Sequence, residues 1–299
     1  MKNILTEKNN PNTRDIDLVS TADLVKKINN EDKKVAKAVE KALPEIAKAV
    51  DIITDSFLKG GRLAYFGAGT SGRLGVLDAS ECWPTFSAPN GMVNGFIAGG
   101  DYALRHSIEG AEDDKEEALR HLAEFKPTRK DVVVGISASG NPQYVLTVLE
   151  EARKKGARTI GITSNPEAKL KEYADITILT RVGPEALTGS SRMKSGTAQK
   201  MILNMLSTAS MVKIGKTYKN YMIDLQLACN KLIDRGNRII AEICEIPLAK
   251  AEEYRIKAGN NVKTACVMYK KQCSKTEAEK LLKKHNGVLR KVFIDEKIS

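Results

Sequence analysis

The stretch Gly67-Ala-Gly-Thr-Ser-Gly-Arg-Leu-Gly-Val-Leu-Asp-Ala-Ser-Glu81 decides the fold of this chain. It follows the apolar run Leu63-Ala-Tyr-Phe66, which is typical of a buried strand, and it leads into a segment with helical spacing of apolar residues. A strand, a glycine-rich turn and a helix place free backbone N–H groups at a helix N-terminus, where an anion is stabilised. Because Thr70 and Ser71 add hydroxyl groups at the same turn, the sequence predicts a phosphate site there.

Glu81, at the end of this stretch, is the first candidate for acid–base chemistry. Leu74, Leu77 and Glu81 are three and four residues apart, which puts them on one face of a helix. We therefore expect Glu81 to point the same way as the apolar side chains, where a carboxyl group tends to have a raised pKa. Such a group suits general acid or base catalysis.

The spacing of Gly67, Gly69 and Gly72 also fits the dinucleotide-binding fingerprint. That site needs an acidic residue about 20 positions further on to hold the ribose. Between Cys82 and Gly100 there is no Asp or Glu, so the sequence disfavours a nucleotide. A tight strand-to-helix turn without a ligand is the other alternative for this loop.

The net charge of +11 raises the question of nucleic acid. Residues 231–299 hold sixteen Lys or Arg against nine Asp or Glu, which is most of the excess. This segment has no RNA-binding signature and no interleaved aromatic residues. The excess charge therefore indicates a solvated lysine-rich helical surface, and we expect no nucleic-acid partner.

Cysteines, histidines and apolar runs exclude several further classes. The five cysteines contain no CxxC pair and the three histidines are scattered, so we expect neither a disulfide framework nor a metal. No apolar run approaches the ~20 residues of a membrane helix. The first ten residues lack the apolar core of a signal peptide. We expect a cytoplasmic protein with no membrane partner.

Strands that alternate with helices predict an α/β fold. Five apolar runs have the length and continuity of buried strands, and helical segments such as 141–155 lie between them. Continuous apolar strands of this kind indicate a doubly wound, mostly parallel sheet flanked by helices, with the last strand near an edge. The expected strands are 63–66, 93–98, 132–136, 159–163 and 176–179.

The rest of the chain predicts three segments, residues 1–59, 60–234 and 235–299. In the first, we expect an extended polar arm up to residue 19, in which Asn12, Thr13, Arg14 and Asp17 are candidates for crossing to another subunit. Ser20 caps a short helix that ends near Ile28, and Glu31–Leu58 forms a long helix with a bend at Pro44. The last segment consists of short helices, one of them opened by the capping box Ser274-Lys-Thr-Glu277.

Small hydroxyl residues follow three of the expected strands. They occur in Thr70-Ser71, in Ser137-Ala-Ser-Gly140 and in Ser164-Asn-Pro166. Because open α/β sheets bind ligands at the carboxyl ends of their strands, these turns point to a phosphorylated small molecule. There is no Walker lysine, which argues against an NTPase.

A further run, Thr188-Gly-Ser-Ser-Arg-Met-Lys-Ser-Gly-Thr-Ala-Gln-Lys200, opens a helix that we expect to extend to about Ile214. Ser190 and Ser191 stand where N-caps belong and are also able to donate to an anion. Arg192 and Lys194 add positive charge. The alternative is a capped helix with solvated basic residues.

With these residues in view, the sequence resembles the N-acetylmuramic acid 6-phosphate etherases over essentially its full length. The motifs that carry the resemblance are Gly69-Thr-Ser-Gly-Arg-Leu-Gly75, Asp78-Ala-Ser-Glu81, Glu109-Gly-Ala-Glu-Asp113, Thr188-Gly-Ser-Ser-Arg-Met-Lys194, Gly196-Thr-Ala-Gln-Lys200 and Leu203-Asn-Met-Leu-Ser-Thr208. The resemblance implies the sugar isomerase (SIS) fold in residues 60–234 and a homodimer without metal or nucleotide. It also implies a ubiquitin-associated-like (UBA-like) helical subdomain at the C-terminus.

The implied activity is that of a carbon–oxygen lyase of cell-wall amino-sugar recycling, which cleaves the D-lactyl ether of N-acetylmuramic acid 6-phosphate. The resemblance assigns the proton donor to Glu81 and a second acid–base role to Glu112. Taken from the residues alone, Glu112 belongs to an acidic, solvated helix face. No cofactor is implied. The candidate substrate-binding residues are Gly69, Thr70, Ser71, Gly72, Ser137, Ser139, Ser190, Ser191 and Lys194.

Lys194 is a candidate for neutralising either the phosphate or the lactate carboxylate of the substrate.

Two positions depart from the family pattern. The turn Ser139-Gly-Asn-Pro-Gln143 lacks the usual threonine before its proline, so one phosphate hydroxyl is expected to be missing. Trp83 stands where a proline is common, and it either narrows the pocket or simply packs.

Two other functions fit the same fold. A non-catalytic phosphosugar sensor is one alternative, and the presence of both Glu81 and Glu112 counts against it. An aldose–ketose isomerase also needs a base at C2 of the sugar but no lactyl pocket. Substrate choice separates the isomerase from the etherase.

Overall fold

The computed structural model describes residues 7–295. These residues form two compact units: residues 7–80 with 91–207, and residues 81–90 with 208–295. The organisation into 1–59, 60–234 and 235–299 stays a prediction. None of the helices in the described part of the chain is long and apolar enough to cross a membrane.

A five-stranded parallel sheet forms the centre of the first unit, as the sequence predicts. The strand order is β2-β1-β3-β4-β5, so that β1 lies between β2 and β3, with Leu63 in register with both Val93 and Val132. The last strand lies at an edge, as expected. The strands are β1 (Leu63–Gly67), β2 (Val93–Ile97), β3 (Val132–Ile136), β4 (Arg158–Thr163) and β5 (Ile176–Leu179).

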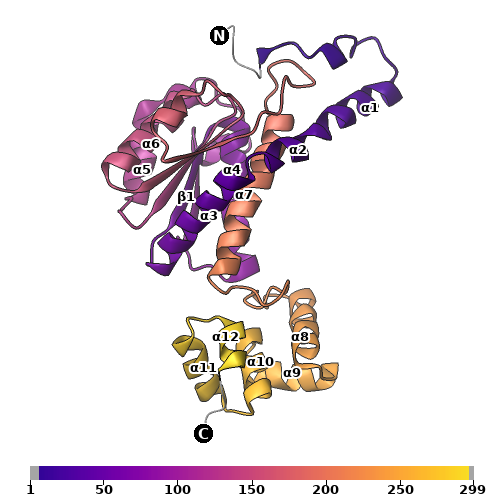
Figure 1. Ribbon diagram of the computed structural model, residues 1–299, viewed down its shortest axis with the longest axis vertical. Coiled ribbons are helices and arrows are strands. Elements are labelled where there is room, and N and C mark those ends of the chain that lie inside the picture. The colour runs from indigo at the N-terminus through magenta and orange to yellow at the C-terminus, as the bar shows by residue number, and fades with distance from the viewer. Residues whose placement is uncertain (1–6, 296–299) are drawn as a thin grey trace. The chain divides into compact units, whose positions relative to one another are not determined.

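Helices cover both faces of this sheet (Figure 1). On one face, α5 (Lys115–Phe125) and α6 (Gln143–Lys154) pack together over a core that includes Ala64 and Phe66. On the other face lie α3 (Leu43–Leu58), α4 (Gly69–Phe86) and α7 (Lys194–Lys213). Because side chains alternate along a strand, Tyr65 points to this second face, where its hydroxyl donates to Asp78 of α4.

The predicted order of strand, glycine-rich turn and helix is present between β1 and α4, and the turn is closely packed. Gly69 opens the helix with φ +54°, a conformation that most side chains disfavour. A Cβ atom at Gly72 would lie 2.5 Å from the Gly67 carbonyl oxygen. These two glycines let the chain leave β1 and enter α4 without a clash.

The prediction of one long helix over Glu31–Leu58 is wrong. The chain instead forms α1 (Thr21–Asp32), α2 (Lys34–Glu40) and α3, and Pro44 lies in the first turn of α3. Proline fits that position because its missing N–H is not needed at a helix start. The Ser20 cap is confirmed, since its side chain accepts from the Asp23 N–H.

The described part of the polar arm packs against its own chain. Asn10 Nδ2 donates to the Pro184 carbonyl at 3.0 Å, and Thr13 Oγ1 donates to the Ala186 carbonyl at 2.8 Å. A short turn of 3₁₀ helix, η2, covers Pro11–Thr13. Residues 1–6 of the expected arm lie outside the described residues.

Short helices form most of the second unit. Their core includes Ile240, Ala265 and Leu289. The predicted capping box is present, because the Ser274 and Glu277 side chains each accept from the other's backbone N–H. The UBA-like character of this region stays a prediction. The helices are α8 (Asn230–Cys244), α9 (Leu248–Lys257), α10 (Val262–Lys271), α11 (Lys275–Lys284) and α12 (Leu289–Ile294).

Candidate active site

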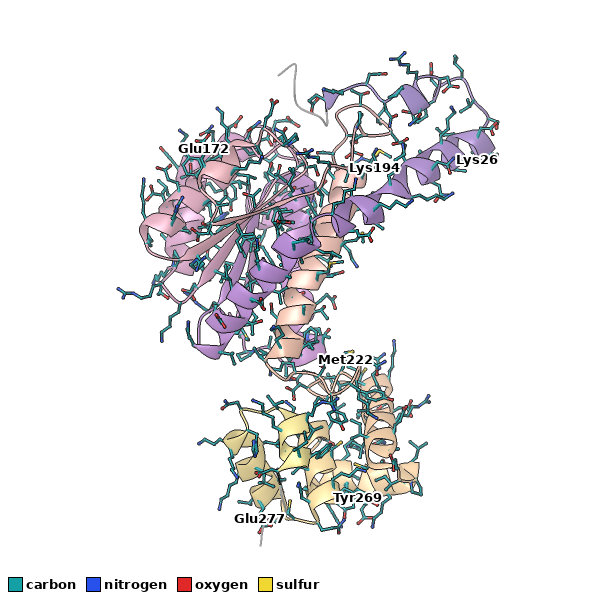
Figure 2. The ribbon with its side chains drawn as sticks, viewed as in Figure 1. Lys26, Glu172, Lys194, Met222, Tyr269 and Glu277 are labelled. Atoms are coloured by element: carbon teal, nitrogen blue, oxygen red, sulfur yellow. The ribbon has the colours of Figure 1, made fainter. Side chains whose placement is uncertain are left out.

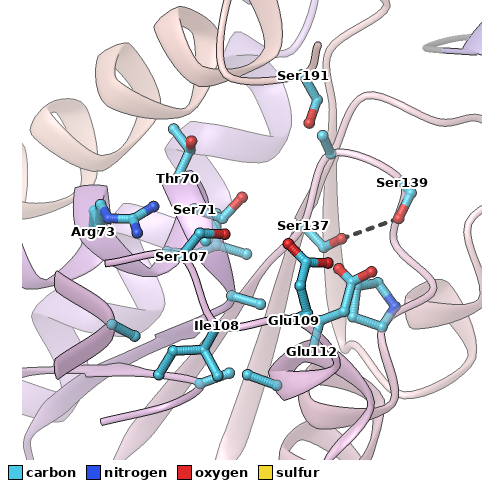
Figure 3. A pocket seen from close by; sticks show the side chains of 18 of the residues that line it. Thr70, Ser71, Arg73, Ser107, Ile108, Glu109, Glu112, Ser137, Ser139 and Ser191 are labelled. Atoms are coloured by element: carbon cyan, nitrogen blue, oxygen red, sulfur yellow. Dashed lines mark hydrogen bonds between the residues drawn. The ribbon is translucent and has the colours of Figure 1, made fainter. Parts of the chain in front are cut away.

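A cavity of about 390 Å³ lies at the carboxyl end of the sheet in the first unit (Figure 3). The turn after β1, the turn after β3 and the loop after β2 all contribute to its wall, as ligand sites in open α/β sheets do. Its polar lining includes Thr70, Ser71, Arg73, His106, Ser107, Glu109, Glu112, Ser137, Ser139 and Ser191.

Three of the candidate substrate-binding residues in the turn after β1, Gly69, Thr70 and Ser71, line the cavity. The first N–H groups of α4 have no partner within the helix, so this wall carries the positive end of the helix dipole. The Ser71 hydroxyl is buried and donates to Gln199 Oε1 at 3.0 Å. Gly72 does not line the cavity; its lack of a side chain allows α4 to approach β1 closely.

The turn after β3 adds two serine hydroxyl groups. Ser137 and Ser139 both line the cavity, and their oxygen atoms lie 3.4 Å apart. Ser137 Oγ accepts from the Gly140 N–H at 3.0 Å, which fixes the turn. Ser164, from the third predicted turn, is 1% exposed and does not line the cavity.

Two carboxylates face these hydroxyl groups. Glu109 and Glu112 lie side by side in the cavity near Ser137, and Glu112 belongs to the 3₁₀ turn η4 (Ala111–Asp113) (Figure 3). Burial raises the pKa of Glu112, and the negative charges of Asp113 and Glu109 raise it further. Glu112 is nevertheless exposed to solvent at this cavity, so its raised pKa means only that it holds a proton more readily than an ordinary glutamate, a property that suits acid–base chemistry.

Arg73 holds the loop that carries these carboxylates. Its Nε donates to the Leu104 carbonyl at 3.1 Å and its Nη2 to the His106 carbonyl at 3.0 Å. Arg73 stands on the first turns of α4, so the turn after β1 and the loop after β2 form one wall.

Glu185, and not a serine, caps the start of α7. Its two carboxylate oxygens accept from the Lys194 and Ser195 N–H groups, each at 2.9 Å. The expectation that Ser190 and Ser191 cap this helix is therefore wrong, because the buried Glu185 takes that place. Ser191 lines the cavity, whereas Ser190 does not.

Lys194 lies away from the cavity, at the start of α7 (Figure 2). It is 1% exposed, and its Nζ lies 2.6 Å from Glu31 Oε2. The loop sequence does not indicate this pairing, since 163 residues separate the two partners.

Glu81 is exposed and does not line the cavity. The expectation that it shares a buried helix face is wrong, because Leu77, four residues earlier, is itself 49% exposed. Along α4, Glu81 stands about 16 Å beyond Thr70, since a helix rises about 1.5 Å per residue. Trp83 is 54% exposed and does not line the cavity either.

Sequence reasoning missed Arg73, His106, Ser107 and Glu109 as lining residues. Glu109 and Arg73 lie inside motifs that carry the family resemblance, so their membership in these motifs was the sequence signal from which they could have been predicted. His106 and Ser107 lie in an irregular loop that gives no periodic pattern. Within residues 7–295, no group of three His, Cys, Asp or Glu side chains is arranged to hold a metal ion.

Comparison with known proteins identifies the domain type. The family model of the glucokinase regulatory protein N-terminal SIS domain matches residues 45–153, and the SIS domain model matches residues 111–209. A crystal structure of a Bacteroides fragilis protein, described as a phosphosugar isomerase involved in capsule formation, superposes with a TM-score of 0.50 at 22% identity. The match covers 68% of this chain and 98% of that one, and it shows a shared fold.

Curated relatives match almost the entire chain. N-acetylmuramic acid 6-phosphate etherase from Actinobacillus pleuropneumoniae serotype 5b is 52% identical over 295 residues, which cover 99% of this chain and 97% of the relative. The enzyme of that name from Clostridium botulinum is 49% identical over 286 residues, covering 96% and 95%. With this identity over nearly the whole length of both, the chain belongs to the N-acetylmuramic acid 6-phosphate etherase family and contains its SIS domain.

Proposed function

We propose that this chain cleaves the D-lactyl ether of N-acetylmuramic acid 6-phosphate, giving N-acetylglucosamine 6-phosphate and D-lactate. The supporting observation is the cavity in which serine and threonine hydroxyls at the start of α4 face the paired carboxylates Glu109 and Glu112. One side of such a cavity suits a phosphate and the other suits proton transfer. The full-length similarity to relatives of that name supports the substrate.

The phosphate contacts in this proposal come from three loops. Backbone N–H groups at Gly69 and the hydroxyls of Thr70 and Ser71 form one side, at the positive end of α4. Ser137, Ser139 and Ser191 form the other. Ser190 and Lys194 were candidates from the sequence, but neither lines the cavity, so this proposal does not use them.

The chemistry requires two proton transfers. In the ring-opened sugar, the C2–H bond is next to the C1 aldehyde and is therefore acidic. A base removes the C2 proton, a double bond forms between C2 and C3, and the C3–O bond breaks as an acid protonates the departing lactate oxygen. Water then adds its hydroxyl to C3 while C2 regains a proton. Each positioned transfer contributes about 100- to 10,000-fold.

Glu112 takes one of these transfers in the proposal. Its raised pKa, caused by burial and by Asp113 and Glu109, brings it closer to the neutral range in which a group both accepts and releases protons. It lines the same cavity as the phosphate turn. A carboxyl group therefore faces the sugar carbons when the phosphate occupies that turn.

Glu81 takes the other transfer, and this assignment depends on a homodimer. Because Glu81 is exposed and stands about 16 Å along α4 from Thr70, the proposal places it at the cavity of a second copy. The proposed activity of the enzyme fits recycling of cell-wall amino sugar in the cytoplasm.

The test is D-lactate release from N-acetylmuramic acid 6-phosphate by the wild type and by Glu112→Gln and Glu81→Gln. We expect release by the wild type and a loss of about 100-fold or more in each variant. Binding of N-acetylglucosamine 6-phosphate without any lactate release would refute the etherase and favour a sensor. Conversion of an aldose phosphate to a ketose phosphate would instead favour an isomerase.

A further inference from the structure

Gln199 lies beside the phosphate turn and has no part in the chemistry described above. It stands on α7, it is 2% exposed, and its Oε1 accepts from the Ser71 hydroxyl at 3.0 Å. Ser71 is 8% exposed and lines the cavity, whereas Gln199 does not. The glutamine therefore reaches the ligand only through the serine.

This arrangement leaves one polar atom of the glutamine without a partner. Among residues 7–295, Gln199 Nε2 is a buried donor with no hydrogen bond. Buried donors of this kind are rare, because each has lost its hydration without compensation. A half-turn of the amide exchanges Oε1 and Nε2, and Nε2 then donates to Ser71 Oγ.

The orientation of the amide decides what Ser71 offers to a ligand. A serine hydroxyl has one proton, and a phosphate dianion only accepts hydrogen bonds. When Ser71 gives its proton to Gln199 Oε1, it has none for the phosphate. When Gln199 Nε2 donates to Ser71 Oγ, the hydroxyl proton is free to point into the cavity.

We propose that Gln199 is a positioning residue that turns its amide toward Ser71 when a phosphate binds, so that the Ser71 hydroxyl donates to a phosphate oxygen. The inference rests on the proposed function, because it requires a phosphorylated ligand in this cavity. Packing supports it: a Cβ atom at Gly196, one turn before Gln199, would lie only 3.4 Å from Thr70 Cγ2. That close approach keeps the two helix starts, and with them Gln199 and Ser71, at hydrogen-bond distance.

The test is a double-mutant cycle read by calorimetric titration with N-acetylglucosamine 6-phosphate. Gln199→Met keeps the side-chain volume and removes both polar atoms. We expect it to weaken binding about fivefold to tenfold, the worth of one oriented hydrogen bond. In the Ser71→Ala background the same change is expected to have almost no effect, because the hydroxyl that it orients is gone.

Gln226→Met is the matched control. Gln226 Nε2 donates to Ser87 Oγ at 2.7 Å, the arrangement proposed for Gln199, and neither residue lines the cavity. Its replacement is expected to leave the affinity unchanged.

Three results would overturn the inference. Equal losses from Gln199→Met with and without the Ser71 hydroxyl would mean that Gln199 acts by packing alone. An unchanged affinity in Gln199→Met would also refute it while leaving the proposed function intact. A wild type that binds no N-acetylglucosamine 6-phosphate would refute the phosphosugar site itself, and the inference with it.

Discussion

The ammonium group of Lys194 lies 2.6 Å from the Glu31 carboxylate, and both side chains are almost fully buried. Glu31 also accepts from Asn12 Nδ2 at 2.9 Å and pairs with Lys34. This one carboxylate therefore ties α1 to the start of α7 and to the described part of the N-terminal arm. A lysine expected to meet the substrate instead holds the structure around the site.

Loss of the Glu31 charge is expected to destabilise the protein. Burial alone would raise the pKa of Glu31, but hydrogen bonds from Lys194, Lys34 and Asn12 outweigh it and hold the pKa at about 2, against an ordinary 4.5. A lowered folded pKa means that its stabilisation is present above pH 4.5 and is lost as the pH falls towards 2. In Glu31→Gln, we expect a loss of about 3 kcal/mol at pH 7, because a buried lysine is left unpaired.

Urea denaturation at pH 7 and pH 3 checks this prediction. The difference between wild type and Glu31→Gln should shrink at pH 3. Lys34→Ala is the control, since Lys34 is half exposed and its ion pair is worth less than about 1 kcal/mol. Equal losses in the two variants at pH 7 would contradict the prediction.

The buried carboxylate of Asp78 is expected to be a second point of high sensitivity. It accepts from Tyr65 Oη at 2.9 Å, Asn204 Nδ2 at 2.7 Å and Ser207 Oγ at 3.1 Å, and so joins β1, α4 and α7. Asp78→Ala would remove the acceptor that Tyr65 and Asn204 share, whereas Ser207 keeps its bond to the Leu203 carbonyl, and the change should cost about 3 kcal/mol or more in unfolding free energy. Tyr65→Phe removes one of the donors and should cost only about 1 kcal/mol. A cost for Asp78→Ala no larger than that for Tyr65→Phe would argue against this network.

Two adjacent serines offer a matched pair for the phosphate site. Ser191 lines the cavity and Ser190 does not. Ser191→Ala should therefore weaken binding of N-acetylglucosamine 6-phosphate by about tenfold, as expected for a hydrogen bond to a charged group. Ser190→Ala should leave the affinity unchanged. Calorimetric titration measures both affinities. A larger loss of affinity in Ser190→Ala than in Ser191→Ala would mean that Ser190, and not Ser191, contacts the phosphate.

Glu81 and Glu112 are expected to act in different subunits of the proposed homodimer. Each of Glu81→Gln and Glu112→Gln should be inactive alone. An equimolar mixture, unfolded and refolded together, should regain about a quarter of the wild-type lactate release, because half of the dimers are mixed and each has one intact site. No recovery, with mixed dimers verified by mass spectrometry, would place both glutamates in the cavity of a single chain.

The pH profile is expected to report on Glu112. Asp113 and Glu109 help to raise the pKa of Glu112, so removal of the Asp113 charge should lower it. In Asp113→Asn, which leaves the lining of the cavity unchanged, the Glu112 limb of the kcat/KM profile should move to lower pH. An unchanged profile would show that Glu112 is not the titrating group. Lys115→Ala, a change of charge two residues further on, is the control.

Local residue chemistry was sufficient to predict most of the fold. The five strands agree with the predicted runs to within one residue at each end. For β1, β3 and β4 the reason is that a strand buried on both faces has to be almost continuously apolar, whereas β2 and β5 are largely half-buried. The glycine-rich turn between β1 and α4 was equally predictable, since Gly69 and Gly72 serve steric needs that no other residue meets as well. The break between α2 and α3 was missed, because proline is tolerated inside a first turn and its position alone does not say where a helix starts.

The sequence by itself determined the parallel sheet, the hydroxyl-bearing turns and the family, because these depend on neighbouring residues and on long motifs. Only the tertiary structure decided which motif residues face the cavity. It paired Lys194 with a carboxylate 163 positions away, gave the α7 cap to Glu185 and left Glu81 in solvent. A charged side chain goes to whichever partner offsets its loss of hydration, and that partner is fixed by how the whole chain folds.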